Sequence, residues 1–183
     1  MPLSITIPEQ NLFNNETNEF LDIKATTLTL EHSLRSIAKW ESKWHKPYLS
    51  EKPKTKEETI DYIRCMTVTS SHNPVDDVVY YGITEENAKD IQKYIDDPMT
   101  ATTFRENKRH GPKEVITSEL IYYWMVYNGI PFECQNWHIN RLLTLIRVCS
   151  IKNAPSKKMS PNEILKQNHA LNQARKAKYN THG

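Results

Sequence analysis

Glycine is scarce in this chain of 183 residues, which contains 4 glycines against 10 prolines. So few glycines exclude glycine-rich phosphate loops and disfavour folds with many tight turns that need a positive φ angle. Long hydrophobic runs are also missing, because the longest, residues 120–127, is far shorter than the roughly 20 residues that span a bilayer. No charged segment followed by an apolar one opens the chain. We therefore expect no secretory signal and no membrane partner.

Cysteine pairs and catalytic sequence motifs are absent as well. The three cysteines, Cys65, Cys134 and Cys149, are an odd number without paired spacing, so we expect a reducing environment and no disulfide framework. The chain contains no nucleophile elbow, no Walker A loop, no dinucleotide-binding glycine motif and no His-Glu-x-x-His motif. These absences predict a protein that is not an enzyme and uses no cofactor.

One pair of residues has the chemistry of a metal ligand set or of a nucleophile and base. Cys134 and His138 are four residues apart, so a helix would place them on one face. A structural zinc site needs four ligands, and no second close pair accompanies this one. A nucleophilic cysteine needs an orienting group and an oxyanion hole as well. We interpret the pair as a core cysteine beside a hydrogen-bonded histidine, and we predict no metal site.

Charge is unevenly distributed along the chain, although the net charge is only +2. Residues 152–183 contain seven basic residues and one acidic residue, so this segment carries +6 and residues 1–151 carry −4. An acidic body with a basic arm could pair with a second copy of itself, with an acidic partner or with nucleic acid. The arm could also be a solvated tail without a partner.

Aromatic residues gather in two places. Six of them between residues 122 and 137 could form a stacking platform for single-stranded nucleic acid. Such platforms include basic residues, and residues 118–136 contain neither lysine nor arginine, which favours core or a protein interface. The second group comprises Trp40, Trp44, His45 and Tyr48. Any part of it that the core leaves uncovered is a candidate partner surface.

Hydrophobic periodicity predicts a small β-hairpin followed by helices. Alternating residues at 3–7 and within 20–30 predict two strands, joined by a turn over residues 11–18. Apolar stripes and capping residues predict helices at residues 30–46, 55–66, 84–95, 115–128, 137–151 and 160–178. The stripe of the first helix comprises Leu30, Leu34, Ile37 and Trp44, with Trp40 beside it, and that of the third comprises Ala88, Ile91 and Ile95. The further local signals are a capping box of Thr55 and Glu58, Gly82 as the end of an apolar run and Gly129 as the end of the fourth helix. Loops are expected at residues 67–77, 99–113 and 152–159. The predicted core is the pair of helices at 115–128 and 137–151.

These elements predict a mainly α protein with a small N-terminal β-hairpin, of the α+β class, and an extended basic C-terminal helix. Its expected parts are a hairpin arm at residues 1–30, a helical body at residues 31–151 and a basic arm at residues 152–183. The last helix has a strong start signal, with Ser160 as N-cap, proline at the first position and Glu163 at the third. Its apolar residues are few, so we expect it to need a partner for stable order.

Three blocks of sequence resemble those of a family of tailed-bacteriophage proteins. The first block comprises residues 30–34 (LEHSL) and 39–47 (KWESKWHKP), the second residues 114–125 (EVITSELIYYWM) and the third residues 137–149 (WHINRLLTLIRVC). The ending, at residues 158–160 and 171–183, is similar as well. Members of this family are usually labelled tail assembly chaperones or uncharacterised phage proteins.

The resemblance implies a non-enzymatic factor in the host cytoplasm that coats the tape-measure protein while tail-tube subunits polymerise around it. It brings no catalytic, cofactor-binding or metal-binding residues to this chain. The partners that it implies are phage tail proteins, namely the tape measure or the tail-tube and baseplate subunits. We expect a homo-oligomer or assembly component with multivalent contacts of moderate affinity, because the tube must later displace it.

Two other functions are compatible with the sequence. The chain could be a structural component of the virion tail, at the baseplate, neck or tail completion ring, with its hairpin adding strands to a neighbouring sheet. It could also be a nucleic-acid-binding packaging or regulatory factor that uses the basic arm. Presence in purified particles would favour the first alternative. Binding that does not depend on salt would count against the second, because phosphate contacts are salt-dependent.

Overall fold

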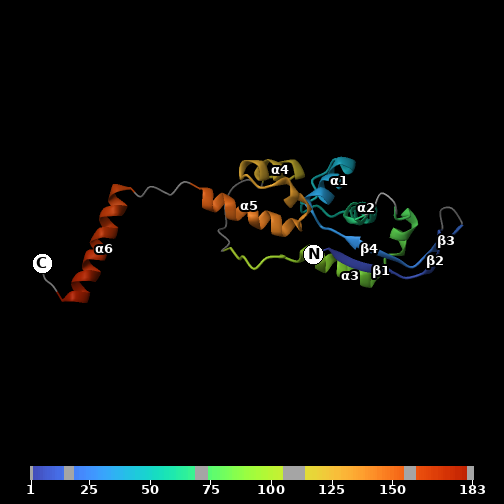
Figure 1. Ribbon diagram of the computed structural model, residues 1–183, viewed down its shortest axis with the longest axis horizontal. Coiled ribbons are helices and arrows are strands. Elements are labelled where there is room, and N and C mark those ends of the chain that lie inside the picture. The colour runs from blue at the N-terminus through green and yellow to red at the C-terminus, as the bar shows by residue number, and fades with distance from the viewer. Residues whose placement is uncertain (1, 15–18, 69–73, 105–113, 155–159, 181–183) are drawn as a thin grey trace. The chain divides into compact units, whose positions relative to one another are not determined.

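A computed structural model describes residues 2–14, 19–68, 74–104, 114–154 and 160–180 of the chain. The chain divides into two compact units, residues 1–151 and 152–183. The first unit contains four short strands and most of the helices, and the second contains helix α6 (Pro161–Tyr179) (Figure 1). This arrangement confirms the predicted α+β class, with a small N-terminal hairpin and a C-terminal helix.

The four strands form one long two-stranded hairpin. β1 (Leu3–Ile7) pairs antiparallel with β4 (Thr26–Leu30), and β2 (Gln10–Asn14) pairs antiparallel with β3 (Glu19–Ile23). A single register runs through both pairs. Pro8 separates β1 from β2, and its missing N–H group accounts for the interruption of the ladder.

The hairpin turns one apolar face towards the core. Ile5, Ile7 and Ile23 are nearly or fully buried. The alternation of inward and outward side chains shifts by one position beyond Pro8, so Leu12 packs against the core while Phe13 is 50% exposed. The prediction of a turn at residues 11–18 is therefore wrong at its start, because β2 occupies residues 10–14. Its inward-facing positions are even-numbered whereas those of β1 are odd-numbered, so one alternating pattern does not fit both strands. Residues 15–18 lie outside the described part.

α1 (Leu34–Trp44) is central to the helical packing. The hydroxyl of Ser33 caps its start by accepting a hydrogen bond from the Ser36 N–H group at 3.3 Å. The buried apolar side chains of α1 are Leu34, Ile37 and Trp40. α1 packs against α2 (Lys56–Met66) and against α4 (Ser118–Tyr127). The predicted stripe is confirmed for Leu34 and Ile37. Trp44, which the sequence pattern places on the stripe, is only half-buried, whereas Trp40, which the pattern places beside it, is 1% exposed.

Two local signals between α1 and α3 are present as predicted. Thr55 and Glu58 form a capping box, in which each side chain accepts a hydrogen bond from the other residue's backbone N–H group, at 3.2 and 2.8 Å. Gly82 ends the 3-10 helix η1 (Asp77–Gly82), and its carbonyl accepts a hydrogen bond from Gln10 Nε2 at 2.6 Å. A Cβ atom on Gly82 would stand 2.6 Å from that nitrogen, so glycine permits this close approach to the hairpin.

α3 (Glu85–Asp96) lies along β1 and covers part of the hairpin (Figure 1). Ile91 is buried and Ile95 is half-buried, as predicted. Ala88 is exposed instead of buried, and Tyr94 takes its place on the inner face. A two-stranded hairpin is marginal by itself in water, so this cover contributes to its stability.

α4 and α5 (Ile139–Asn153) supply buried side chains to the same cluster as the hairpin and α1. The members from these two helices are Ile121, Met125, Ile139, Leu142 and Ile146. The predicted core of two helices is therefore too narrow. The physical reason is that α4 buries only one face, so the pair needs the apolar surfaces of α1 and the hairpin to complete a core.

In the second unit, α6 begins as predicted. Glu163 Oε2 accepts a hydrogen bond from the Ser160 N–H group at 2.8 Å, the Ser160 hydroxyl accepts one from the Glu163 N–H group at 3.3 Å, and Pro161 occupies the first position. Every residue of α6 is exposed. Among all described residues, no helix combines the length and apolar character that crossing a membrane requires. Of the predicted loops, residues 69–73, 105–113 and 155–159 lie outside the described part.

Candidate protein-binding surface

One face of α4 consists of exposed apolar side chains. Tyr123, Val126 and Tyr127, which we call the α4 stripe, are 59%, 62% and 74% exposed. The rings of Tyr123 and Tyr127 stack with centroids 6.1 Å apart. On the opposite face Ile121 and Met125 are fully buried, as the helical period requires for residues two positions away from the tyrosines. The fold therefore uses one side of this apolar helix and leaves the other uncovered.

A buried carboxylate from α1 anchors the start of α4. Glu41 Oε2 accepts a hydrogen bond from the Ser118 N–H group at 2.7 Å, and Glu41 Oε1 accepts one from the Tyr48 N–H group at 2.7 Å. The first N–H groups of a helix lack partners within it, and the helix dipole favours a negative charge there. The Thr117 hydroxyl caps the same end by accepting a hydrogen bond from the Leu120 N–H group. The α4 stripe thus stands on a helix whose position is fixed by α1.

The chain beyond α4 extends the aromatic surface. Gly129 ends the helix as predicted, with a φ angle of 65° that favours glycine. The Tyr122 hydroxyl then donates a hydrogen bond to Gln135 Oε1 at 2.9 Å, which ties α4 to the following turn. Phe132 lies in that turn, is 55% exposed and has its ring centroid 6.3 Å from that of Tyr122. Exposed aromatic rings therefore continue past the end of the helix.

An apolar groove of about 760 Å³ borders α4. Its apolar lining comprises Leu49, Pro53, Val115, Ile116 and Trp124. Its volume falls within the range of pockets that hold small molecules or peptide side chains. Trp124 follows Tyr123 directly, so groove and stripe belong to the same helix. We call the α4 stripe, Phe132 and this groove together the α4 surface.

The charge near the α4 surface is negative. Residues 114–136 contain three acidic residues and no lysine or arginine. The acidic residues are Glu114, Glu119 and Glu133, and all are exposed. Hydrogen bonds from its own backbone N–H group and from the Thr117 hydroxyl hold the pKa of Glu119 below its usual value. Basic groups from other segments lie nearby as well, namely Lys52 in the groove lining and Arg35, whose charge acts on Tyr122. An apolar partner with neighbouring lysine or arginine residues would complement this surface.

The aromatic group around α1 is used mainly inside the fold. The indole N–H of Trp40 donates to a backbone carbonyl of α2 at 2.9 Å, and the indole N–H of Trp44 donates to Asp61 Oδ2 at 2.8 Å. Tyr48 is buried and stacks on a tyrosine of α2 with ring centroids 3.8 Å apart. In the predicted group only His45 is fully exposed. These aromatic residues therefore hold α1 to α2 and offer little surface to a partner.

Cys134 and His138 do not share a helix. Cys134 lies in the 3-10 helix η2 (Phe132–Asn136), and His138 directly precedes α5. His138 Nε2 donates to the Tyr94 carbonyl at 3.0 Å, and Nδ1 accepts from the Asn140 N–H group at 3.3 Å. Both ring nitrogens are therefore engaged, and both side chains are buried. Within the described residues, no group of three or more histidine, cysteine, aspartate or glutamate side chains could hold a metal ion.

A second buried histidine belongs to a cluster that the sequence gives no sign of. His32 is 2% exposed, and its Nδ1 lies 2.5 Å from the Tyr62 hydroxyl. The ring centroids of His32 and His138 are 5.0 Å apart. Burial, assisted by the neighbouring His138, lowers the pKa of His32 to about 3, and burial raises the pKa of Tyr62 well above its usual value. Both groups therefore stay neutral at physiological pH and act as structural hydrogen-bond partners.

The buried His32 predicts a loss of stability in acid. The unfolded chain protonates a histidine near pH 6.5, whereas the folded chain resists protonation of His32 until about pH 3. The unfolded state therefore binds more protons in this window, and stability falls as the pH drops below 6.5. We expect a slope of about 1.4 kcal/mol per pH unit, or about 2 kcal/mol lost at pH 5, in urea titrations. His32→Gln should reduce this slope and leave the contribution of His138, whose pKa burial also lowers, whereas His169→Gln, at an exposed position of α6, should leave the slope unchanged.

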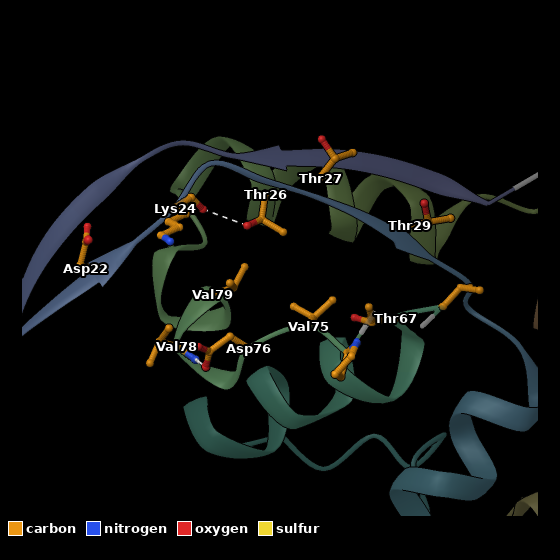
Figure 2. Close-up of a pocket in the computed structure, with 12 residues that line it drawn as sticks. Asp22, Lys24, Thr26, Thr27, Thr29, Thr67, Val75, Asp76, Val78 and Val79 are labelled. Carbon is orange, nitrogen blue, oxygen red and sulfur yellow. Dashed lines mark hydrogen bonds between the residues drawn. The ribbon is translucent and has the colours of Figure 1, made fainter. Parts of the chain in front are cut away.

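A further hollow of about 520 Å³ lies beside the hairpin (Figure 2). Figure 2 shows side chains of β3, β4 and η1 around it, with the Thr26 hydroxyl donating to the Lys24 carbonyl at 2.9 Å. The Asp76 carboxylate in its wall accepts a hydrogen bond from the Val78 N–H group at 3.2 Å. Its 12 lining residues include no histidine or cysteine, and its polar side chains are four threonines, Lys24, Asp22 and Asp76.

The α4 surface is thus the candidate site that the described residues support best. Comparisons with protein-family models, curated proteins and solved structures find no match to this chain.

Proposed function

We propose that this protein is a non-enzymatic factor of phage tail morphogenesis, namely a tail assembly chaperone that binds the tape-measure protein in the host cytoplasm. The observation that carries this proposal is the α4 surface, where stacked exposed tyrosines adjoin an apolar groove. Aromatic side chains of this kind dominate the binding energy of protein interfaces. Isolated apolar patches on a monomer need no such explanation, but an aromatic stripe beside a groove does.

Two of the sequence blocks that resemble the tail chaperone family contribute to this surface. The second block, residues 114–125, includes Tyr123 and Trp124 together with much of the groove wall. The first block includes Glu41, which anchors the start of α4. These two blocks thus help to build and position the surface, although Val126, Tyr127 and Phe132 lie outside them, and this supports a role in binding rather than in catalysis.

The proposed partner chemistry follows from the shape of the surface. A long coiled tape measure exposes apolar stripes before the tail tube encloses it. Such a stripe could lie across the α4 stripe, with one of its larger side chains in the groove, in the manner of a helix bound in a groove. The acidic residues nearby favour stretches in which lysine or arginine flanks the apolar stripe. One surface of this size gives moderate affinity, and several copies along one partner add avidity.

Removing the two exposed rings tests the proposal. We expect Tyr123→Ser/Tyr127→Ser to weaken capture of the tape-measure protein by at least about tenfold, because the stripe would lose both aromatic contacts. Biolayer interferometry with immobilised tape-measure fragments would measure this. Tyr81→Ser is the matched control, since Tyr81 is 54% exposed but lies in η1. Equal capture by the wild type, the double variant and Tyr81→Ser would contradict the proposal.

A structural component of the virion tail is the second candidate function. The observation that favours it is the hairpin, where Phe13 and Phe20 lie opposite each other with ring centroids 5.0 Å apart. Phe20 is 74% exposed, so the pair could insert into a neighbouring subunit. Quantitative mass spectrometry of purified virions against infected-cell lysate separates the candidates. A fixed copy number per particle would support the structural component, and abundance in lysate alone would support the chaperone.

A further inference from the structure

The C-terminal helix α6 has several apolar side chains, and all of them are exposed. Ile164, Leu165, Leu171 and Tyr179 are between 44% and 67% exposed. Helices are marginally stable in water by themselves, even at the length of α6, and most gain stability by burying an apolar face. The 19 residues of α6 have a strong start signal but no tertiary partner within their unit. This helix therefore has the properties of a segment that docks on another surface.

The charge of α6 is opposite to that of the α4 surface. α6 contains four basic residues, Lys166, Arg175, Lys176 and Lys178, against the single acid Glu163. The acids near the α4 surface flank the stripe at both ends, with Glu119 one turn before Tyr123 and Glu133 next to Phe132. The two elements thus combine exposed apolar side chains with opposite charges. Such complementarity is typical of surfaces that bind each other.

We propose that α6 of one copy of this protein docks on the α4 surface of a second copy. Ile164 and Leu171, which are seven residues apart and lie on one side of the helix, face the tyrosines of the α4 stripe. Arg175 and Lys178 lie on the same side of the helix as Ile164 and Leu171, so in the docked helix they approach the acidic residues Glu119 and Glu133. The contact rests on the α4 surface being a protein-binding site, but not on the tail role or on the tape measure as its partner.

This docking would give the protein a way to cover its own binding surface. A copy whose α4 surface holds a neighbour's α6 cannot bind a second apolar helix there. A partner with a longer apolar stripe would displace α6 because it engages several copies at once. Self-association would then store the chains in a protected form and release them where the partner is present. The exposed aromatic residues would thereby be kept from nonspecific aggregation.

Charge reversal in the full chain tests the contact. We expect sedimentation equilibrium to show reversible self-association of the purified protein. Its dissociation constant should rise about tenfold or more in Arg175→Glu/Lys178→Glu and in Glu119→Lys/Glu133→Lys. All four positions are exposed, so both variants should fold, and circular dichroism verifies this. An equimolar mixture of the two variants should associate within about threefold of the wild type, because opposite charges meet again.

The matched control is Glu57→Lys/Glu85→Lys. It makes the same change in total charge as Glu119→Lys/Glu133→Lys, at exposed positions in the first turns of α2 and α3. Its dissociation constant should stay within about twofold of the wild type, since a change of total charge alone is screened at physiological salt. Association that survives in both α4 and α6 variants, or a mixture that fails to restore it, would overturn the proposal.

A chain that stays monomeric at all concentrations would overturn it as well, including the case in which α6 folds back on its own copy. This test uses the purified protein alone, whereas the proposed function is tested with the tape-measure protein. If the protein is strictly monomeric but captures the tape-measure protein through Tyr123 and Tyr127, only the docking of α6 on the α4 surface is contradicted. If the protein self-associates through α6 but does not capture the tape-measure protein, only the proposed role in tail assembly is contradicted.

Discussion

Replacing Trp40 with alanine is expected to lower the free energy of unfolding of the first unit by about 3–5 kcal/mol. Trp40 is 1% exposed and packs between Trp44 and Tyr48, with ring centroids 6.1 and 5.2 Å away. Its indole N–H donates to the Glu58 carbonyl at 2.9 Å. The substitution would leave a cavity where α1 meets α2 and would remove that hydrogen bond. Urea titrations followed by far-ultraviolet circular dichroism would measure the loss.

Two further variants separate the contributions to this effect. Trp40→Phe keeps most of the ring and loses the hydrogen bond, so we expect a loss of about 1–2 kcal/mol. Trp124→Ala removes a half-buried tryptophan from the groove wall and should cost less than half as much as Trp40→Ala. If Trp40→Ala and Trp124→Ala destabilised the unit equally, α1 would not be central to the core.

Replacing Glu41 with alanine is expected to lower the free energy of unfolding by about 3 kcal/mol. The carboxylate accepts hydrogen bonds from the N–H groups of Tyr48 and Ser118, each at 2.7 Å, and is 7% exposed. Its removal leaves two N–H groups without their partner in a largely buried place. Glu41→Gln should cost about half as much, because the amide oxygen can still accept one of the two bonds.

Glu57→Ala is the control for this prediction. Glu57 is an exposed glutamate in the first turn of α2, and its loss should change stability by less than about 0.5 kcal/mol. Because Glu41 anchors the start of α4, the Glu41→Ala variant should also protect the backbone amides of α4 less well from hydrogen exchange. A variant with normal stability and normal protection of α4 would show that Thr117 alone fixes this helix.

Local sequence signals predicted the helices well where they are chemically explicit. The capping boxes at Thr55 and Ser160 and the glycine stop at Gly129 occur in the structure as predicted, and the apolar stripe of α1 does so for Leu34 and Ile37. Each signal involves groups within a few residues of one another, so the sequence contains the whole interaction.

The features that the sequence did not reveal depend on contacts between distant segments. The strand at Gln10–Asn14 was mistaken for a turn because the inward face changes phase beyond Pro8. Glu41 reads as one more charged residue of α1 until Ser118, 77 positions further on, lies beside it. The hydrogen bond between His32 and Tyr62 joins residues 30 positions apart. No local sequence pattern predicts these pairs. The sequence also does not predict that the α4 stripe is exposed, because α4 is apolar on almost every side and shows no periodicity that separates a buried from an exposed face.

The central claim is that the α4 surface binds the tape-measure protein during tail assembly. The most direct measurement places a photo-reactive phenylalanine analogue at position 127 of the full chain, during phage growth, and identifies the cross-linked proteins by mass spectrometry. Tyr127 is 74% exposed and lies in the α4 stripe, while the same analogue at Tyr81 provides the control. We predict cross-links from position 127, but not from position 81, to the tape-measure protein. Equal labelling from both positions, or no tape-measure peptide from position 127, would contradict the account.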